Sequence, residues 1–177
     1  ADAVVSGSRP FPAEVESLLL ELGGPQSRQV SFSSMIVFPR SGASRLVQVR
    51  ALEGDFPYYG QFETQPASGV EAFRRDDGAL VDHVVMLQYG LAVGDTVKIG
   101  RVFFPIVGRL QRIPGEVAAI SSLEPRVYIP MAFLEDTKLV QQGSRLSYAA
   151  MLKLEGTEAP KSLGRLKEGL EDHNLRL

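Results

Sequence analysis

Two strand–helix–strand patterns, one at each end of the chain, constrain the fold most strongly. The first lies in residues 1–53 and the second in residues 145–177. Together they predict an α+β fold with a ferredoxin-like split βαβ sheet, in which the first and last strands are antiparallel neighbours. The start of the first strand and the end of the last one would then emerge at the same edge of the sheet.

In the first pattern, residues 3–8 read as a short strand, and apolar side chains spaced along one face indicate a helix after it. Pro12 suits the first helical position, and one helical stripe is formed by Val15, Leu18, Leu19 and Leu22. Alternating apolar residues over 28–38 and 47–51 predict a hairpin. Met35 and Val37 lie on the opposite face from the other apolar residues, so the first hairpin strand is expected to be buried on both sides near its end.

The second pattern repeats this order with a weaker helix. Residues 146–154 read as a strand, and Pro160 opens a helix whose apolar stripe is Leu163, Leu166 and Leu170. A last short strand is expected at Leu175–Leu177. These two terminal units form one predicted subdomain.

Residues 54–144 have a different character, because glycine or proline recurs every few residues between short apolar runs. This pattern is typical of a compact β-rich lobe with tight turns. Two short helices are expected within it, around Val81–Tyr89 and Met131–Lys138. The segment is therefore predicted to form a β-rich subdomain inserted into the first one.

The charge balance excludes one large class of partner. The chain has 19 basic and 21 acidic residues, for a net charge of -2, and its densest basic stretch is Arg74-Arg75, followed at once by two aspartates. Nucleic-acid binders depend on basic clusters that neutralise phosphates, so no nucleic-acid partner is expected. The longest charge-free runs have 11 residues, against roughly 20 for a spanning helix. Any membrane attachment is expected to come from flanking segments.

The chain has few of the residues and motifs that are typical of catalytic sites. The chain has no cysteine and only two histidines, and none of the common nucleophile, phosphate-loop or metalloprotease motifs. His83 follows Asp82 and could be grouped in space with Ser121, Ser122 or Ser144, although a surface or capping role is the commoner one. The paired carboxylates fall in turns, so neither a metal site nor a cofactor site is expected. We therefore do not expect this protein to be an enzyme.

Residues 50–60 form the densest aromatic stretch. Phe56, Tyr58 and Tyr59 could form a stacking surface for a ligand, or a hinge whose rings fill the seam between two small cores, and we favour the hinge. Buried tyrosine hydroxyls need hydrogen-bond partners, for which Arg50 and Glu53 are the expected candidates.

The loop over residues 110–125 is unusually apolar, with Ile113, Pro114 and Val117 in its first half. Such a loop either packs beneath the lobe or presents a surface to a partner. Both alternatives stay open, and these three residues are the candidate partner contacts.

Four segments resemble a known family: Leu46–Gly60, Ala79–Asp82, Leu87–Gly100 and Pro125–Pro130. Together they are similar to the periplasmic core domain of permeases of the MacB/FtsX superfamily of ABC transporters, and in particular to its YbbP-like branch. The resemblance covers nearly the whole chain.

The resemblance implies a porter-like subdomain from the terminal units and a Sabre-like β-rich subdomain from the insert. It also implies a place between transmembrane helices on the periplasmic face of the bacterial inner membrane. ATP would be hydrolysed by a separate cytoplasmic ATPase subunit, reached through the rest of the permease. A periplasmic protein, a lipid or a lipoprotein would be the envelope partner. The family offers no catalytic residue to carry over.

The leading hypothesis is therefore a non-catalytic extracytoplasmic domain that couples ATP-driven motion to an envelope substrate or partner. One alternative is a lipid- or lipoprotein-binding module, which predicts a continuous apolar cleft between the lobes of about 300 Å³ or more. Another is a small envelope hydrolase, which predicts His83 within about 3.2 Å of a serine hydroxyl and a carboxylate.

Overall fold

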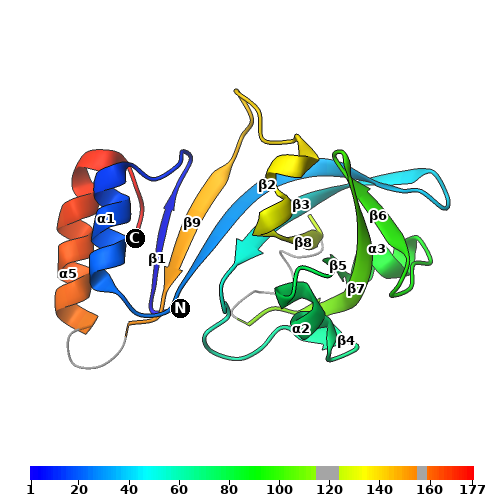
Figure 1. Ribbon diagram of the computed structural model, residues 1–177, viewed down its shortest axis with the longest axis horizontal. Coiled ribbons are helices and arrows are strands. Elements are labelled where there is room, and N and C mark those ends of the chain that lie inside the picture. Colours follow the sequence, from blue (N-terminus) through cyan, green and yellow to red (C-terminus); the bar gives the residue numbers. More distant parts are fainter. Residues whose placement is uncertain (115–123, 155–158) are drawn as a thin grey trace.

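The computed structural model describes residues 1–114, 124–154 and 159–177, and its elements are arranged along one long axis (Figure 1). The strands are β1 (Ala3–Gly7), β2 (Gln26–Phe38), β3 (Ala43–Glu53), β4 (Glu63–Gln65), β5 (Ala79–Asp82), β6 (Thr96–Ile99), β7 (Val102–Arg112), β8 (Arg126–Pro130) and β9 (Ser147–Leu152). The helices are α1 (Ala13–Leu22), α2 (Gly69–Arg74), α3 (His83–Gln88) and α5 (Ala159–Leu170), with short 3-10 turns η1 (Met131–Phe133), η2 (Glu135–Thr137) and η4 (Glu171–His173).

One half of the molecule has the ferredoxin-like strand order predicted from the sequence. Strand β1 pairs antiparallel with β9, and β9 pairs antiparallel with β2. Near the end of the chain, Arg176 forms an antiparallel bridge with Ser6, and their backbones exchange hydrogen bonds of 2.8 and 2.9 Å. The first and last extended segments are therefore antiparallel neighbours, which confirms the predicted fold class.

Helices α1 and α5 lie against each other on one side of this sheet (Figure 1). The apolar stripe of each helix faces the strands, because Val15, Leu19 and Leu166 are fully buried together with Val5 and Leu152. Burial of a side chain of this size stabilises a fold by about 1.5–3 kcal/mol. All the buried members of this core come from residues 1–53 and 145–177.

The other half is a closed barrel. Strand β6 pairs with both β2 and β7, and the ring runs β2, β3, β8, β5, β7, β6 and back to β2. Its interior is filled by apolar side chains from every strand, among them Ile36, Val49, Val97, Ile106 and Ile129. A closed ring leaves no free sheet edge between these six strands.

A second apolar layer covers part of the outside of the barrel. Leu80, Leu110 and Tyr128 point outward from β5, β7 and β8 and are fully buried. They are covered by Phe73 of α2 and by Phe62, which precedes β4. This layer also includes Met151 of β9, so it extends to the ferredoxin-like half.

Strands β2 and β3 run through both halves, since Phe32, Ile36 and Val47 belong to the barrel interior. One predicted subdomain comprises residues 1–53 and 145–177, and the other comprises residues 54–144. The sheet is continuous across the boundary between them, and this division stays a prediction. No helix in the described ranges is long and apolar enough to cross a membrane.

The short elements differ most from expectation. The helix expected around 81–89 begins at His83, because Ala79–Asp82 form β5 and the Asp82 carboxylate caps the helix by accepting from the Val84 N–H at 3.0 Å. The helix expected around 131–138 is two 3-10 turns. The last strand is the single bridge at Arg176.

Candidate functional site at the junction of the two halves

The loop from residue 54 to residue 62, here called the junction loop, carries the three residues predicted to form a hinge. It leaves β3 and crosses to β4 on the barrel. Phe56 packs edge-on against Tyr58 and Phe62, with ring centroids 6.3 and 6.2 Å apart. Phe62 in turn lies 5.1 Å from the ring of Tyr128 in β8. The aromatic residues therefore fill the seam between the halves.

Tyr58 ties the junction loop to the ferredoxin-like sheet. Its hydroxyl lies 2.7 Å from Ser27 Oγ of β2 and donates to the Met151 carbonyl of β9 at 3.3 Å. Ser27 is fully buried and also accepts from the Phe56 N–H at 3.0 Å. One serine thus holds two positions of the loop, in an environment where an unpaired polar group would be costly.

Burial raises the pKa of the Tyr58 hydroxyl above its ordinary value of 10.0. The Asp55 carboxylate acts in the same direction, while the hydrogen bond with Ser27 and the charge of Arg28 oppose it. Burial dominates because a phenolate would lose its hydration. The Tyr58 hydroxyl is therefore a neutral hydrogen-bonding group at physiological pH.

Tyr59 makes the second connection, at the surface. Its side chain is half exposed, and its hydroxyl donates to both carboxylate oxygens of Asp2 at 2.9 and 3.0 Å. Asp2 Oδ2 also accepts from the Leu154 N–H at 2.8 Å. Tyr59 is thus bound to the segment that precedes β1, at the point where this segment meets the end of β9.

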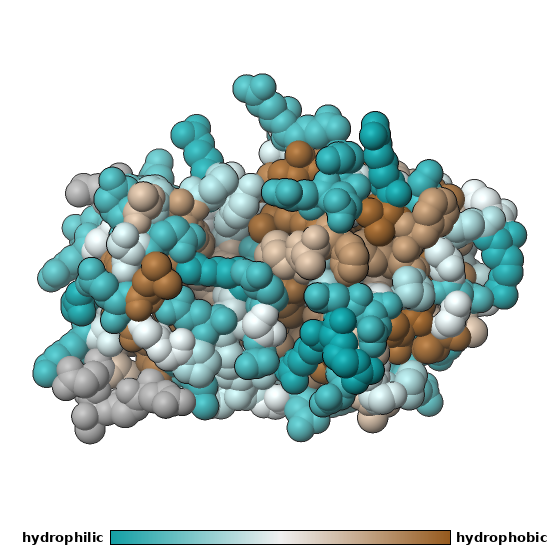
Figure 2. Space-filling model, in the orientation of Figure 1, coloured by the Kyte–Doolittle hydropathy of each residue, from teal (hydrophilic) through white to brown (hydrophobic). Residues whose placement is uncertain are grey.

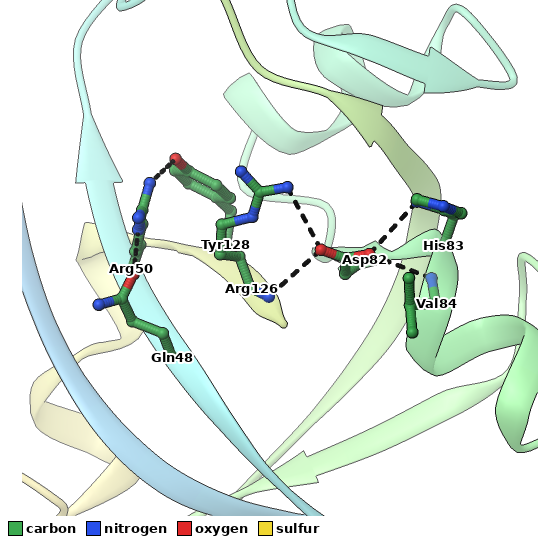
Figure 3. Close-up of polar contacts among 7 residues, drawn as sticks. All are labelled: Gln48, Arg50, Asp82, His83, Val84, Arg126 and Tyr128. Carbon is green, nitrogen blue, oxygen red and sulfur yellow. Dashed lines mark hydrogen bonds and ion pairs between the residues drawn. The ribbon is translucent and has the colours of Figure 1, made fainter. Parts of the chain in front are cut away.

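Of the two partners expected for buried tyrosine hydroxyls, Arg50 bonds to one, although this tyrosine lies in β8 and not in the junction loop. The Arg50 guanidinium donates to the hydroxyl of Tyr128 at 2.9 Å and to Gln48 Oε1 at 2.7 Å (Figure 3). Glu53 forms no hydrogen bond with Tyr58 or Tyr59 among the bonds of the described residues. Sequence reasoning missed Ser27 and Asp2, because neither residue lies near the junction loop in the sequence.

A cleft of about 780 Å³ opens beside the junction loop. Its lining combines apolar and charged residues: Pro25, Asp55, Pro57, Tyr58, Gly60, Gln61, Phe62, Glu63, Thr64, Ala67, Val70, Glu71, Arg74, Gln111 and Lys153. The lipid-binding alternative requires a continuous apolar surface. This cleft is large enough for that alternative, but charged residues interrupt its apolar lining.

Asp82, at the end of β5, is the centre of a buried polar cluster (Figure 3). Its carboxylate accepts from Arg126 Nη2 at 3.3 Å, and both side chains are almost fully buried. The other oxygen lies 3.3 Å from Nδ1 of His83, whose side chain is 43% exposed. Asp82 therefore serves as a helix cap and as the partner of a buried arginine.

The hydrolase alternative needs a serine hydroxyl at His83. The Ser144 hydroxyl instead donates to the Leu139 carbonyl at 3.2 Å and accepts from the Gln141 N–H at 3.1 Å. Ser121 and Ser122 lie outside the described residues. Within the described ranges, no group of three or more histidine, cysteine, aspartate or glutamate side chains could hold a metal ion.

The candidate partner contacts fall in different environments. Ile113 is only 3% exposed and packs in the layer outside the barrel with Leu110. A side chain buried to this degree is not available to a partner, so the packing alternative holds for Ile113. Pro114 is partly exposed and lies close to Gly60, whereas Val117 is outside the described residues. A role in partner contact stays a prediction for Pro114 and Val117.

The architecture, a closed barrel that shares strands β2 and β3 with a ferredoxin-like half, defines an α+β class of domain. The fold matches the periplasmic region of MacB from Actinobacillus actinomycetemcomitans with a TM-score of 0.54 and 15% identity, covering 98% of this chain and 86% of that chain. It matches the extracellular domain of the noncanonic ABC-type transporter YknZ from Gram-positive bacteria with a TM-score of 0.55 and 12% identity, covering 94% and 86%.

The chain belongs to the family of MacB-like periplasmic core domains, whose model matches residues 3–166. It is also 24% identical over 147 residues to the uncharacterized ABC transporter permease YbbP of Escherichia coli (strain K12). That alignment covers 83% of the chain and 18% of YbbP, so the chain spans under a fifth of its relative's length. The resemblance identified from the sequence is confirmed.

Proposed function

We propose that this domain is the non-catalytic, periplasmic part of an ABC transporter permease and couples ATP-driven motion to a substrate or partner in the cell envelope. One observation carries the proposal: both ends of the chain lie on the ferredoxin-like half, at neighbouring antiparallel segments joined at Ser6 and Arg176. The barrel lies at the other end of the long axis (Figure 1). This arrangement suits a domain that flanking membrane spans hold by both ends.

In this proposal the energy comes from elsewhere. A cytoplasmic ATPase subunit would bind and hydrolyse ATP and act through the transmembrane part of the permease. The periplasmic domain would sit on the outer side of the inner membrane and move relative to it. Its own task would be to transmit displacement to an envelope protein, lipid or lipoprotein.

The junction loop would transmit that motion between the halves. Its contacts to the ferredoxin-like half include the hydroxyls of Tyr58 and Tyr59, which make hydrogen bonds, while Phe56 packs on the barrel side of the seam. A few hydrogen bonds, each with a net worth of about 1 kcal/mol, can exchange partners during a rigid-body movement.

The full-length permease provides the test. Replacing residues 1–177 with a short flexible linker should leave assembly with the ATPase subunit and basal ATP hydrolysis in place, while the transport-dependent phenotype is lost. Normal complementation by this deletion would contradict a coupling role. His83→Gln should complement fully, and loss of function in a folded His83→Gln permease would favour the hydrolase alternative instead.

A further inference from the structure

One outer face of the barrel is not covered by any described element, and it is apolar. Leu46 of β3, Met35 and Val37 of β2, and Phe103 of β7 are 50%, 51%, 36% and 58% exposed. The expectation that the end of β2 is buried on both sides was wrong, because only its inward residues, such as Ile36, enter the barrel interior. On the side drawn in Figure 2, hydrophobic residues also gather over the barrel half.

The strand register shows that these side chains are neighbours on one face. Met35 lies directly opposite Leu46. Two residues along β2, Val37 lies opposite Lys98 of β6, which in turn lies opposite Phe103. Directly opposed side chains in a sheet stand on the same face and contact each other. We call these five residues the outer strip.

The charge on the outer strip is positive. The Nζ atom of Lys98 lies 5.4 Å from the centroid of the Phe103 ring, an attractive cation–π geometry. Lys98 makes no ion pair with any described residue. The outward positions of β2, β3 and β6 that flank the strip are uncharged: Ser33, Ser44, Gln48 and Thr96. The Glu124 carboxylate accepts a hydrogen bond from the Ser33 hydroxyl, beyond Met35 and at the end of the strip away from Lys98.

We propose that the outer strip is a docking surface for an envelope protein that presents an amphipathic helix, with its apolar face on Met35, Leu46 and Phe103 and a carboxylate against Lys98. An apolar face with one unpaired cation is complementary to an apolar segment bordered by an acid. Phe103 would be the aromatic anchor at one end of the strip, a type of residue that often dominates binding energy.

Two other occupants fit less well. A second copy would present the same apolar strip with the same cation and no carboxylate within the strip itself, so it complements Lys98 less well than an acidic partner does. A membrane surface would have to reach the end of the molecule opposite to both chain termini (Figure 1). The exclusion of a membrane rests on the proposed function, which sets how the domain is oriented relative to the membrane. The apolar and cationic character of the strip does not depend on the proposed function.

The test uses the 177-residue chain and two synthetic probe peptides with the same leucine face, one flanked by glutamates and the other by lysines. Because it needs neither ATP nor membrane spans, its failure is distinguishable from failure of the coupling proposal. Binding is followed by NMR chemical-shift mapping and fluorescence titration, in the unchanged chain and in Phe103→Ser, Lys98→Glu and Lys98→Arg. Leu20→Ser is the matched control, because Leu20 is 75% exposed on α1, away from the strip.

The glutamate peptide should bind and shift the amide signals of β2, β3, β6 and β7. Phe103→Ser and Lys98→Glu should each weaken it by at least about tenfold, whereas Lys98→Arg and Leu20→Ser should not. Lys98→Glu should also reverse the preference between the two peptides. If Phe103→Ser lowers the thermal stability, Met35→Ser replaces it.

Three results would overturn the proposal. The first is binding of the glutamate peptide elsewhere, or none at all. The second is binding of phosphatidylglycerol vesicles that Phe103→Ser and Lys98→Glu abolish, which would assign the strip to a membrane. The third is a concentration-dependent dimer that Phe103→Ser dissociates, as measured by analytical ultracentrifugation.

Discussion

The hydroxyl of Tyr58 lies 2.7 Å from the hydroxyl of Ser27, joining a loop to a strand 31 residues earlier in the sequence. The contact is partly buried, and Tyr58 also donates to the Met151 carbonyl. Strands β2 and β9 of the ferredoxin-like half are thereby both connected to the junction loop. The stability of this connection can be measured separately from transport.

Tyr58→Phe should lower the free energy of unfolding by about 1–2 kcal/mol, because it removes two hydrogen bonds in a partly buried place. Urea titration followed by circular dichroism gives this value. Tyr59→Phe is the matched control, since the hydroxyl of the half-exposed Tyr59 bonds to Asp2 at the surface, and its effect should stay within about 0.5 kcal/mol. Equal effects of the two variants would contradict the structural role of the Ser27 contact.

The raised pKa of Tyr58 predicts a loss of stability at alkaline pH. In the unfolded chain this phenol ionises around pH 10, whereas in the folded protein it keeps its proton to higher pH. Above pH 10 the unfolded state therefore binds fewer protons than the folded state, and the free energy of unfolding falls as the pH rises through the folded pKa.

Tyr58→Phe should flatten this alkaline decline relative to the unchanged protein. Unfolding by urea at a series of pH values from neutral to alkaline measures both curves. An identical alkaline decline in the unchanged protein and in Tyr58→Phe would show that burial of this hydroxyl does not control it.

Gly54→Ala should destabilise the protein by more than about 2 kcal/mol, because two costs combine. Gly54 has a φ of +89°, and an added Cβ would lie 2.8 Å from the Gln26 carbonyl oxygen and 2.9 Å from the Cα of Ser27. Gly42 has a φ of +71° with no atom within 4 Å of an added Cβ. Gly42→Ala should therefore cost only about 1 kcal/mol of left-handed strain. A Gly54→Ala variant as stable as Gly42→Ala would show that the start of the junction loop is not closely packed on β2.

Asp82→Ala should lower the free energy of unfolding by about 1.5–3 kcal/mol, because it removes a buried carboxylate that accepts a hydrogen bond from Arg126. It also removes the cap of α3 at Val84. Asp77→Ala is the control, since Asp77 pairs with Arg75 at the surface, where such a pair is worth at most about 1 kcal/mol. Differential scanning calorimetry of both variants compares them, and similar losses would contradict the assigned role of Asp82.

The terminal units could be predicted from the sequence because their signals are local. The stripes with Leu19 and Leu166 mark the buried faces of α1 and α5 directly, and two strand–helix–strand units have few ways to share one sheet. The insert over residues 54–144 was predicted from its recurring glycines and prolines, and the family resemblance implied the same division, which stays a prediction. The strand order follows from these local patterns together with general rules of topology.

The barrel and the junction contacts could not be predicted in this way. Closure depends on β6 pairing with both β2 and β7, and no local pattern states which strands meet. Ser27 and Asp2 are ordinary polar residues whose partners lie 31 and 57 positions away. Whether Met35 and Phe103 are exposed depends on which other elements pack over that face of the folded sheet. Alternation of apolar residues in the sequence does not distinguish a covered face from an open one.

We propose that the two halves move relative to each other when the ATPase works. Electron-spin distance measurement between labels at Leu20 on α1 and Leu87 on α3, both strongly exposed, tests it in the full-length permease with its ATPase subunit. A label pair at Leu87 and Arg101, an exposed residue in the turn between β6 and β7 of the barrel, serves as the internal reference. We expect the distance distribution between Leu20 and Leu87 to shift between the nucleotide-free and ATP-trapped states while the reference pair stays unchanged. Identical distributions for Leu20 and Leu87 in both states would contradict the claim.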